Sequence, residues 1–535
     1  MRSAHAQREV FLRPEVKMEP LVSGWHAWNH LISPIQHALN VANRQLPLLD
    51  SFIRNPSVHA AACSDPAMFG GPFVELSVEQ VPEIQRFLEL LQQRHSRLIA
   101  LAHDIKRLDA LLQEQAKGYA LDEFYPKIPE SLSGLVEFLY DINNHPRLRF
   151  HEALVYDEYF ETSGQQICLS LADEERRPFF MTTPRLAAAD GLMLPISFTD
   201  PRLDRLASMR TTPASLAAIA QELEIADAQR ARFENLFTTD PPARRVPVAE
   251  GGKVVMRYFG HACVLIQSAR TSVLIDPMLS WENHRRDGRF TGHDLPERLD
   301  YVILTHSHHD HFSPEVLIQL RSRIDRIVVP ANNSGSVTDP SMELALRRLG
   351  FERIDVLSGL DEIRFQDGII TSLPFTGEHC DLDIHSRQAI HLQIEGRRFA
   401  FFADSNGIDS AQYRRIARRL GRRLDGLFIG MECRGGPLSW LYNPLLTKPI
   451  SRKNDESRRL SGLDSERAWR ALQEFDVASA FVYAMGQEPW LRFIMGLEYT
   501  PESVQKKEVA ALLERCAGAS MHAECLYLSR EMTFE

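Results

Sequence analysis

The sequence predicts an α/β protein in two parts. A mixed α+β accessory domain is expected over residues 1–246, and an αββα sandwich, with sheets inside and helices outside, over residues 247–535. Three observations predict this arrangement. The 535 residues exceed what one ordinary core organises. A proline-containing stretch at 239–247, closed by Gly251-Gly252, is typical of a linker. After it, short strand-like runs alternate with helical ones in two series.

The first half has a mixed pattern and no chemical motif. Apolar residues at helical spacing predict one long amphipathic helix: Ile84, Phe87, Leu88, Leu91, Leu98, Ala102, Ile105, Leu108 and Leu112. Strands are expected near 167–171, 179–182 and 192–198, and helices at 215–224 and 229–237. The nine histidines of this half are dispersed, which favours surface or packing roles. We expect an accessory, docking or dimerisation domain.

The second half is richer in short strands. Runs at 254–259, 263–267 and 272–275 resemble a meander that ends at Asp276-Pro277, and further strands are expected at 302–305, 326–329, 369–373, 389–394 and 399–403. One helix start is marked clearly, because Ser313, Pro314 and Glu315 supply an N-cap, a proline at the first helical position and an acidic first turn.

The most informative segment follows the strand at 302–305. It has the pattern H-x-H-x-D-H, formed by His306, His308, Asp310 and His311. Imidazole and carboxylate groups are common ligands of zinc, iron and manganese. A loop just past a strand end can direct alternate side chains at two neighbouring ions. The segment therefore predicts a metal site with two ions.

With these strands in place, residues 253–535 resemble the metallo-β-lactamase fold superfamily. The resemblance rests on the loop pattern, on Gly260-His261-Ala262-Cys263, on Ile275-Asp276-Pro277, on Gly377-Glu378-His379 and on Ala403-Asp404. In such a fold His306 and His308 would hold one metal and Asp310 and His311 the second. Asp404 would bridge, since its two oxygens can serve two cations roughly 3.5 to 4 Å apart.

Two departures from the hydrolytic pattern bear on the chemistry. Hydrolases of this fold commonly take a further histidine from a late loop, but none occurs between Leu392 and Met521, and His522 is a poor candidate. In addition, Glu378 stands beside His379 where a histidine ligand is expected. Adjacent residues of an extended chain face opposite ways, so we expect only one of the two to reach the metals. Choosing Glu378 gives three histidines and three carboxylates, a set closer to iron sites than to hydrolytic zinc; His379 stays open as an alternative ligand or a neighbour of the ligands.

This donor pattern resembles the dinuclear-iron β-hydroxylase of chloramphenicol biosynthesis and its relatives. The resemblance implies two iron ions held by His306, His308, Asp310, His311, Glu378 and Asp404, the last two being the catalytic carboxylates. It implies a monooxygenase that hydroxylates the β-carbon of an aminoacyl thioester on a nonribosomal peptide synthetase carrier domain. O2 would be the co-substrate, and electrons would come from an external reductant through a donor protein. It also implies a homodimer built on the first half. The alternative is a dinuclear zinc hydrolase of an ester, lactone or phosphodiester.

Two further segments have candidate functions. A basic run at 413–423 favours either a solvated helix face or a dock for an acidic carrier domain, through Arg414, Arg415, Arg418, Arg419 and Arg422. The long segment from Cys433 to Gly462 is expected to be a loop, and its Trp440 and Tyr442 either cover the substrate as a lid or only anchor it. Structural roles are expected for His261, Asp276 and Glu432.

Composition excludes several other classes. Hydrophobic residues make up 44% and charged residues 25%, as in soluble globular proteins, and the formal net charge of −10 argues against nucleic acid as a partner. No apolar run approaches the roughly 18 to 20 residues that span a bilayer. The first nine residues lack the apolar region of a signal peptide. Seven scattered cysteines without a C-x-x-C pair suit a reducing cytoplasm.

Overall fold

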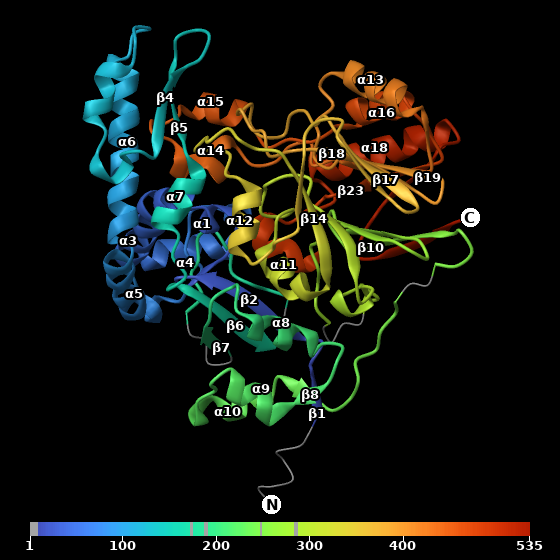
Figure 1. Cartoon of the computed structure of the whole chain (residues 1–535), viewed down its shortest axis with the longest axis horizontal. Coiled ribbons are helices and arrows are strands. Elements are labelled where there is room, and N and C mark those ends of the chain that lie inside the picture. The colour runs from blue at the N-terminus through green and yellow to red at the C-terminus, as the bar shows by residue number, and fades with distance from the viewer. Residues whose placement is uncertain (1–8, 172–174, 187–190, 247–248, 283–286) are drawn as a thin grey trace, which may run out of the picture.

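The computed structural model describes residues 9–171, 175–186, 191–246, 249–282 and 287–535, and it has a sandwich with two seven-stranded sheets within those residues (Figure 1). In strand order the first sheet contains β15 (Ile354–Leu357), β14 (Ile324–Pro330), β13 (Leu299–Ile303), β12 (Ser272–Ile275), β11 (Val264–Gln267), β10 (Val254–Tyr258) and β25 (Arg530–Phe534). The second contains β16 (Glu362–Phe365), β17 (Gly368–Leu373), β18 (Ala389–Ile394), β19 (Arg397–Phe401), β21 (Gly426–Gly430), β23 (Ser479–Tyr483) and β24 (His522–Cys525). The αββα fold predicted for this half is confirmed.

Each sheet is antiparallel at one side and parallel at the other. The H-x-H-x-D-H loop and Asp404 follow the ends of strands in the parallel parts. In the first sheet β12, β13 and β14 run parallel, and the H-x-H-x-D-H loop follows the end of β13. In the second sheet β19 and β21 run parallel, and Asp404 lies just past the end of β19. The carboxyl ends of parallel strands form one edge, where binding sites gather in open α/β sheets.

Apolar side chains form the layers of the sandwich. Between the sheets lies a core that includes Val264, Ile303, Ile390 and Phe401. Outside the second sheet, α13 (Ser410–Leu420), α16 (Ser465–Gln473) and α18 (Val504–Gly518) cover another. Outside the first sheet lie α11 (Pro314–Leu320) and α12 (Met342–Arg348).

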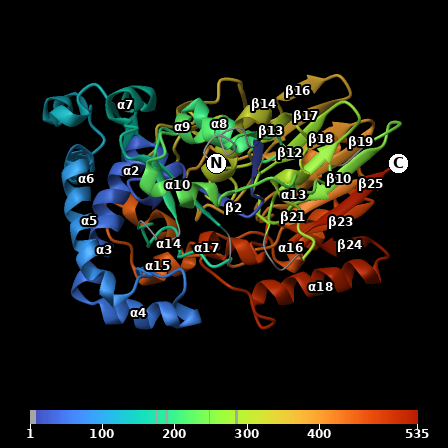
Figure 2. The ribbon, with the colours of Figure 1, turned by 90° about the horizontal axis from the view of Figure 1, so that it is seen from below.

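The first half packs against this outer layer of the first sheet. Its helices between residues 29 and 159 stand at one side of the sandwich, and those between residues 201 and 234 lie below it in the view of Figure 1 (Figures 1 and 2). It contains a four-stranded sheet of β3 (Trp25–His26), β2 (Val16–Val22), β6 (Gln165–Leu171) and β7 (Leu192–Pro195). The smaller strands are β1 (Glu9–Leu12), β8 (Ala214–Ser215) and β9 (Phe237–Thr238) in one sheet and β4 (Val136–Tyr140) with β5 (Pro146–Phe150) in a hairpin. The helices are α1 (Asn29–Ile32), α2 (Pro34–Asn40), α3 (Leu46–Arg54), α4 (Pro56–Ser64), α5 (Val81–Arg94), α6 (Ser96–Gln115), α7 (Glu152–Tyr159), α8 (Pro201–Ser208), α9 (Leu216–Glu222) and α10 (Asp227–Glu234).

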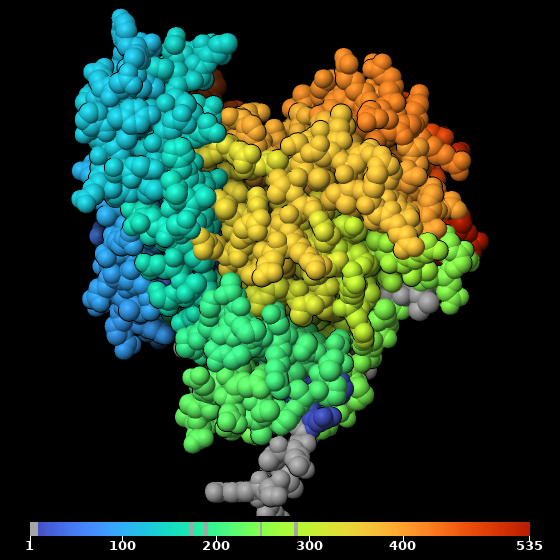
Figure 3. Space-filling view, viewed as in Figure 1, coloured from blue at the N-terminus to red at the C-terminus, as the bar shows by residue number. Residues whose placement is uncertain are grey.

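One hydrophobic core runs through both domains. It joins Trp28 and Phe180 of the first half to Leu304 and Phe312 of the second. Figure 3 shows the first half, in blue and green, lying directly against the yellow part of the second half. The accessory domain therefore buries apolar surface that the sandwich would otherwise expose.

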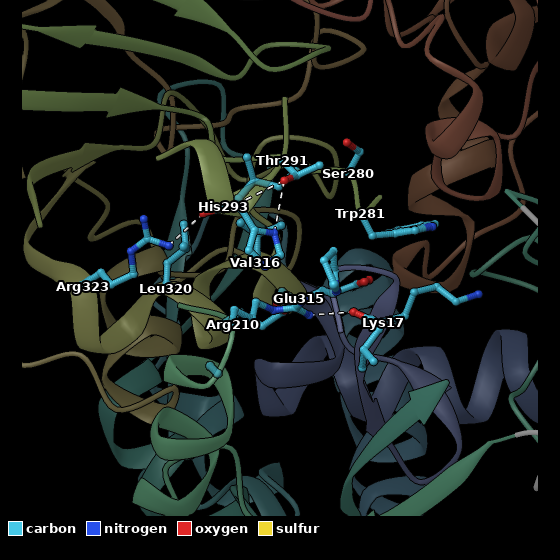
Figure 4. A pocket seen from close by; sticks show the side chains of 16 residues that line it. Lys17, Arg210, Ser280, Trp281, Thr291, His293, Glu315, Val316, Leu320 and Arg323 are labelled. Atoms are coloured by element: carbon cyan, nitrogen blue, oxygen red, sulfur yellow. Dashed lines mark hydrogen bonds between the residues drawn. The ribbon is translucent and has the colours of Figure 1, made fainter. Parts of the chain in front are cut away.

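A buried charge cluster crosses the same boundary. Arg177 lies 2.8 Å from the carboxylate of Glu315 on α11, and Arg185 lies 2.8 Å from Glu19 on β2. Beside it is a small pocket of about 50 Å³, where Arg210 donates to the carbonyl of Val16 (Figure 4). None of the six predicted metal ligands lines that pocket.

Several predicted elements differ in detail. The structure has two helices, α5 and α6, where a single long helix was predicted. The helix is interrupted at His95, whose buried ring lies 2.9 Å from the hydroxyl of Ser23. Residues 179–182 form a turn rather than a strand, and β7 ends at Pro195. The segment 433–462, expected to be a loop, contains α14 (Leu438–Tyr442) and α15 (Arg452–Ser457). The end of the expected linker, at 247–248, lies outside the described residues, as do 1–8. No helix of the described chain is long and apolar enough to cross a membrane.

Candidate metal centre

The four loop residues come together at the open edge of the sandwich and are almost fully buried. Three adjoining groups each place one ligand atom per residue within 4.8 Å of the others: His306, His308, Glu378 and His379; His306, His311 and Asp404; and His261, Asp310 and His311. The predicted pairs, His306 with His308 and Asp310 with His311, thus fall in separate groups. All six predicted ligands are present in this arrangement.

Asp404 lies between the two predicted ligand pairs. Its Oδ2 is 3.1 Å from Nε2 of His311 and 3.6 Å from Nε2 of His306, one histidine from each predicted pair. The backbone before it is strained, since Ala403 has a φ of 43°, and the hydroxyl of Tyr483 accepts a hydrogen bond from the Ala403 amide. The fold therefore fixes the direction of this side chain.

The histidines are held through one ring nitrogen each. Nδ1 of His311 lies 2.7 Å from Asp276, whose other oxygen accepts a hydrogen bond from the Thr305 amide. Nδ1 of His306 lies 3.0 Å from the Thr305 hydroxyl. Such partners orient metal-binding imidazoles and fix their tautomers. Nε2 of both rings is buried and faces Asp404, and apart from that carboxylate it has no hydrogen-bond partner among the described residues, as expected of atoms placed for an ion.

His308 is held through Nε2, whereas His306 and His311 are held through Nδ1. Its Nε2 lies 3.0 Å from the hydroxyl of Tyr442, and its Nδ1 lies 3.1 Å from Oε1 of Glu378. A neutral His308 that donates from Nε2 to Tyr442 keeps the lone pair of Nδ1 for an ion beside Glu378. Tyr442 thus supports a ligand from α14. Its predicted role as a lid stays a prediction.

Glu378 and His379 both reach the first group. Glu378 has a φ of 67°, and its Oε2 lies 2.9 Å from Nδ1 of His379. Gly377 before it is required, because a Cβ there would overlap the side chain of Asn406. Nε2 of His379 is buried and has no hydrogen-bond partner in the described part of the chain. The geometry therefore keeps both residues as candidate ligands.

His261 lies beside the site, and a backbone amide determines which of its ring nitrogens carries the proton. The Gly486 amide donates to Nδ1 of His261, so a neutral ring carries its proton on Nε2. That nitrogen lies 3.1 Å from Asp310. His261 therefore presents a proton to Asp310 rather than a lone pair to an ion, which supports the structural role expected for it.

Burial and neighbouring charges give the protonation states that ligands need at His306 and Asp310. At the other two loop positions burial would lower the pKa, but neighbouring carboxylates raise the pKa of His308 and raise that of His311 well above its usual value. Burial lowers the pKa of His306 well below its usual value, and His311 and His308 lower it further, so this imidazole is neutral. Burial alone would raise the pKa of Asp310, but His311 and His261 hold it well below its usual range. The donor set, its unpartnered atoms and its charge all fit two cations.

A cavity of about 640 Å³, here called the metal-side cavity, opens onto the site. Its wall includes His308, Asp310, Glu378 and Asp404. Trp440 also lines it, as the lid prediction requires, together with Glu432. Burial, with Asp404 and Asp310 nearby, raises the pKa of Glu432 well above its usual value.

Several residues at the site were not predicted, and most of them come from the first half. His309, the unassigned position of the loop, turns away from the ligands, and its ring lies 4.9 Å from Phe180 and 6.0 Å from Trp28. Its Nε2 lies 3.1 Å from the carbonyl of Ile494. Residues 67–73 line the cavity, where Gly70 is essential because a Cβ would lie 2.1 Å from the Gly496 carbonyl. The glycine-proline sequence at 70–72 was the available signal.

Arg414, Arg415, Arg418 and Arg419 lie on the exposed face of α13, opposite the buried Tyr413, Ile416 and Ala417, and Arg422 follows the end of the helix. Arg414 pairs with Glu474 at 2.9 Å, and Arg422 donates to the Gln473 carbonyl. None of the α13 arginines lines the metal-side cavity. Docking at this helix stays a prediction.

Comparisons with known proteins agree with this site. Residues 11–241 match the family model described as the diiron non-heme beta-hydroxylase N-terminal domain, and residues 255–396 match the beta-lactamase superfamily domain. A relative from Streptomyces venezuelae, the 4-amino-L-phenylalanyl-[CmlP-peptidyl-carrier-protein] 3-hydroxylase, is 33% identical over 528 residues, which cover 97% of this chain and 99% of the relative.

The fold agrees over the same length. The crystal structure of CmlA, a diiron beta-hydroxylase from Streptomyces venezuelae, superimposes with a TM-score of 0.91 at 32% identity, covering 99% of this chain and 100% of that one. A mutant of the CmlA beta-hydroxylase gives 0.89 at 32% identity, covering 98% and 100%. The chain therefore belongs to the family of CmlA-like diiron β-hydroxylases with a metallo-β-lactamase domain.

Proposed function

We propose that this protein is a dinuclear-iron monooxygenase that hydroxylates the β-carbon of an aminoacyl group held as a thioester on a carrier domain. The observation that carries the proposal is the donor set: three histidines and three carboxylates in adjoining buried groups at the end of a cavity. Oxygen-rich sets of this kind suit iron better than a histidine-rich hydrolytic set does. The relative named above acts on an aminoacyl group of a peptidyl carrier protein, which supports the substrate class.

The chemistry needs a reductant. One atom of O2 enters the substrate Cβ–H bond as a hydroxyl, and the other leaves as water with two protons and two electrons from an external donor. Bound iron would supply the site at which O2 is reduced. The protein orients the candidate ligands through Asp276, Thr305 and Tyr442 and buries their side chains beside the metal-side cavity.

Ligand roles follow the same argument. His306, His308 and Glu378 would hold one iron, Asp310 and His311 the other, and Asp404 would bridge. Carboxylates can change between one and two bonded oxygens, so Glu378 is the ligand expected to move. The first half would support a homodimer.

Metal content and the electronic spectrum of the purified protein test the proposal. We expect two irons per chain, an oxo-bridged diferric absorption, and hydroxylated product only when carrier-bound substrate, O2 and reductant are all present. Two zincs per chain with ester hydrolysis in the absence of reductant would contradict it.

One matched pair of variants tests the ligand choice. Glu378→Ala should abolish iron loading, whereas His379→Ala should retain two irons per chain. The opposite result would show that His379 is the ligand.

A dinuclear zinc hydrolase is the second candidate. The observation that favours it is the buried, unpartnered Nε2 of His379, which could complete a more histidine-rich site. In that case metal-bound hydroxide would be the nucleophile, and Glu378 would only position His379 through the contact at 2.9 Å.

A further inference from the structure

A second cavity, of about 730 Å³, adjoins the metal-side cavity, and we call it the outer cavity. The two share the walls formed by Gly70, Gly71, Pro72, Phe73, Pro437 and Trp440. The outer cavity is otherwise lined mainly by the first half, including Asn43, Leu48, Asn55, Val58, Met181 and Thr182. The two cavities therefore adjoin at Trp440, with the ligands on one side and the accessory domain on the other.

Hydrogen bonds and ring stacking hold Trp440 in place at the junction between the cavities. Nε1 of Trp440 donates to the Gly70 carbonyl at 3.1 Å, and its ring stacks on Phe179 at 6.0 Å. Arg44 donates to the carbonyls of Trp440 and Leu441 at 2.9 and 3.0 Å. Charge-assisted bonds of this kind hold α14 against the first half. Trp440 thus lies at a fixed narrow point between the two spaces.

Size and lining indicate what the outer cavity holds. The metal-side cavity alone lies within the range of ordinary small-molecule sites, about 300 to 1,000 Å³. It can take an aminoacyl group without help, so the additional space fits an elongated extension of that group. Amide and hydroxyl side chains of Asn43, Asn55 and Thr182 alternate there with apolar Leu48 and Met181.

The far end of the outer cavity reaches solvent. Val58, on α4, is 57% exposed although it is apolar, and Asn55 beside it is also exposed. A group tethered to a protein outside could enter here. A pantetheine arm has the matching chemistry, because it is long and thin and carries two amides between apolar carbons.

We propose that the outer cavity is the entry channel for the phosphopantetheine arm, with the arm passing Trp440 to deliver its aminoacyl group to the metal-side cavity. This inference rests on the proposed function. It places the docked carrier domain against α3 and α4 of the first half, because the exposed opening lies there. The arginines of α13 line neither cavity.

The test uses S-acetyl-phosphopantetheine with a fluorophore on its phosphate end, titrated with the metal-loaded full chain and followed by anisotropy. Saturable binding to the wild type is expected. Val58→Trp should weaken it at least tenfold by filling the opening. Ser57→Trp is the matched control, since Ser57 is the exposed neighbour on α4 and lines neither cavity, and it should bind like the wild type.

A third variant separates the two openings. Arg434→Trp narrows the exposed side of the metal-side cavity and should leave probe binding within about twofold of the wild type. Absent binding to the wild type, or unchanged binding to Val58→Trp, would overturn the inference. So would loss of binding in Arg434→Trp alone. Melting temperatures check folding.

Metal content and hydroxylation, measured on the same preparations, keep the two proposals apart. Hydroxylation of carrier-bound substrate that is unimpaired by Val58→Trp would remove the channel and leave the proposed function standing. If the protein bound zinc, showed no oxygenation and still bound the probe in a way that Val58→Trp weakened, the channel would stand and the proposed function would be wrong.

Discussion

At the scale of single residues, the centre depends on which ring nitrogen each histidine turns inward. Asp276 and Thr305 hold Nδ1 of His311 and His306, whereas Tyr442 holds Nε2 of His308. The sequence could indicate that the four candidate ligands of the loop lie together, because they fall within six residues. Tyr442 could not be assigned this role, since it is 134 residues from His308 and only tertiary packing joins them.

Tyr442→Phe should weaken metal binding without unfolding the protein. The substitution removes the hydroxyl beside His308 and keeps the ring, so the imidazole loses its fixed tautomer. We expect affinity for the metal to fall about 10- to 100-fold, measured by competition with a chelator. Tyr156→Phe is the control, because its buried hydroxyl bonds Ser33, which is not a candidate ligand. Equal affinities in both variants would contradict the assignment.

At the scale of elements, the buried strands of the second half and the helices α9, α10 and α11 were predicted best. The periodicity of the second half located β10 to β14 and β17 to β19 closely, because buried strands there are short and bounded by turns. The break between α5 and α6 was missed, since the apolar spacing continues across His95 and the cause is a contact with distant Ser23. The helices within 433–462 were missed because glycine and proline surround them.

One contact between elements makes stability depend on pH. Glu152, at the start of α7, accepts a hydrogen bond from the amide of Ser341, the N-cap of α12. Burial, and to a smaller extent Asp339, raises the pKa of Glu152 to about 7. The folded protein therefore binds a proton that the unfolded chain releases, so the stabilisation is full below about pH 4.5 and is lost as the pH rises through 7.

Glu152→Gln should remove this dependence. At pH 8 the variant should be more stable than the wild type by up to about 3 kcal/mol, and the difference should shrink towards pH 5. Urea unfolding at several pH values measures it. Glu158→Gln, exposed on the same helix, should show no such trend. A constant difference at all pH values would show that Glu152 does not titrate as argued.

At the scale of the whole molecule, the two domains behave as one folded body. The linker and the change from a mixed to a strand-rich pattern could be predicted from the sequence. The shared core could not, because the sequence shows which residues are apolar but not which other surface packs on them. Trp28 and Phe180 of the first half are packed in the same cluster as Leu304 and Phe312. The domains should therefore unfold together.

Arg177→Met tests this coupling. It removes the cation beside Glu315 and leaves that carboxylate buried, so the free energy of unfolding should fall by about 3 to 5 kcal/mol while a single transition is retained. Calorimetry and circular dichroism should give the same midpoint. Arg54→Met, which removes an exposed partner of Asp50, should change stability by less than about 1 kcal/mol. Two separate transitions in the wild type would contradict the shared core.

His309 gives this coupling a mechanical side. It is the one residue between His308 and Asp310, which belong to opposite halves of the centre, and its ring is lodged among aromatic side chains of the first half. If Phe180 and Trp28 moved, for instance when a protein bound to the accessory domain, His309 would have to move with them. The backbone of the loop between the two predicted ligand pairs would then shift. The spacing of the two predicted ligand pairs is thereby tied to side chains that lie outside the domain that contains those pairs.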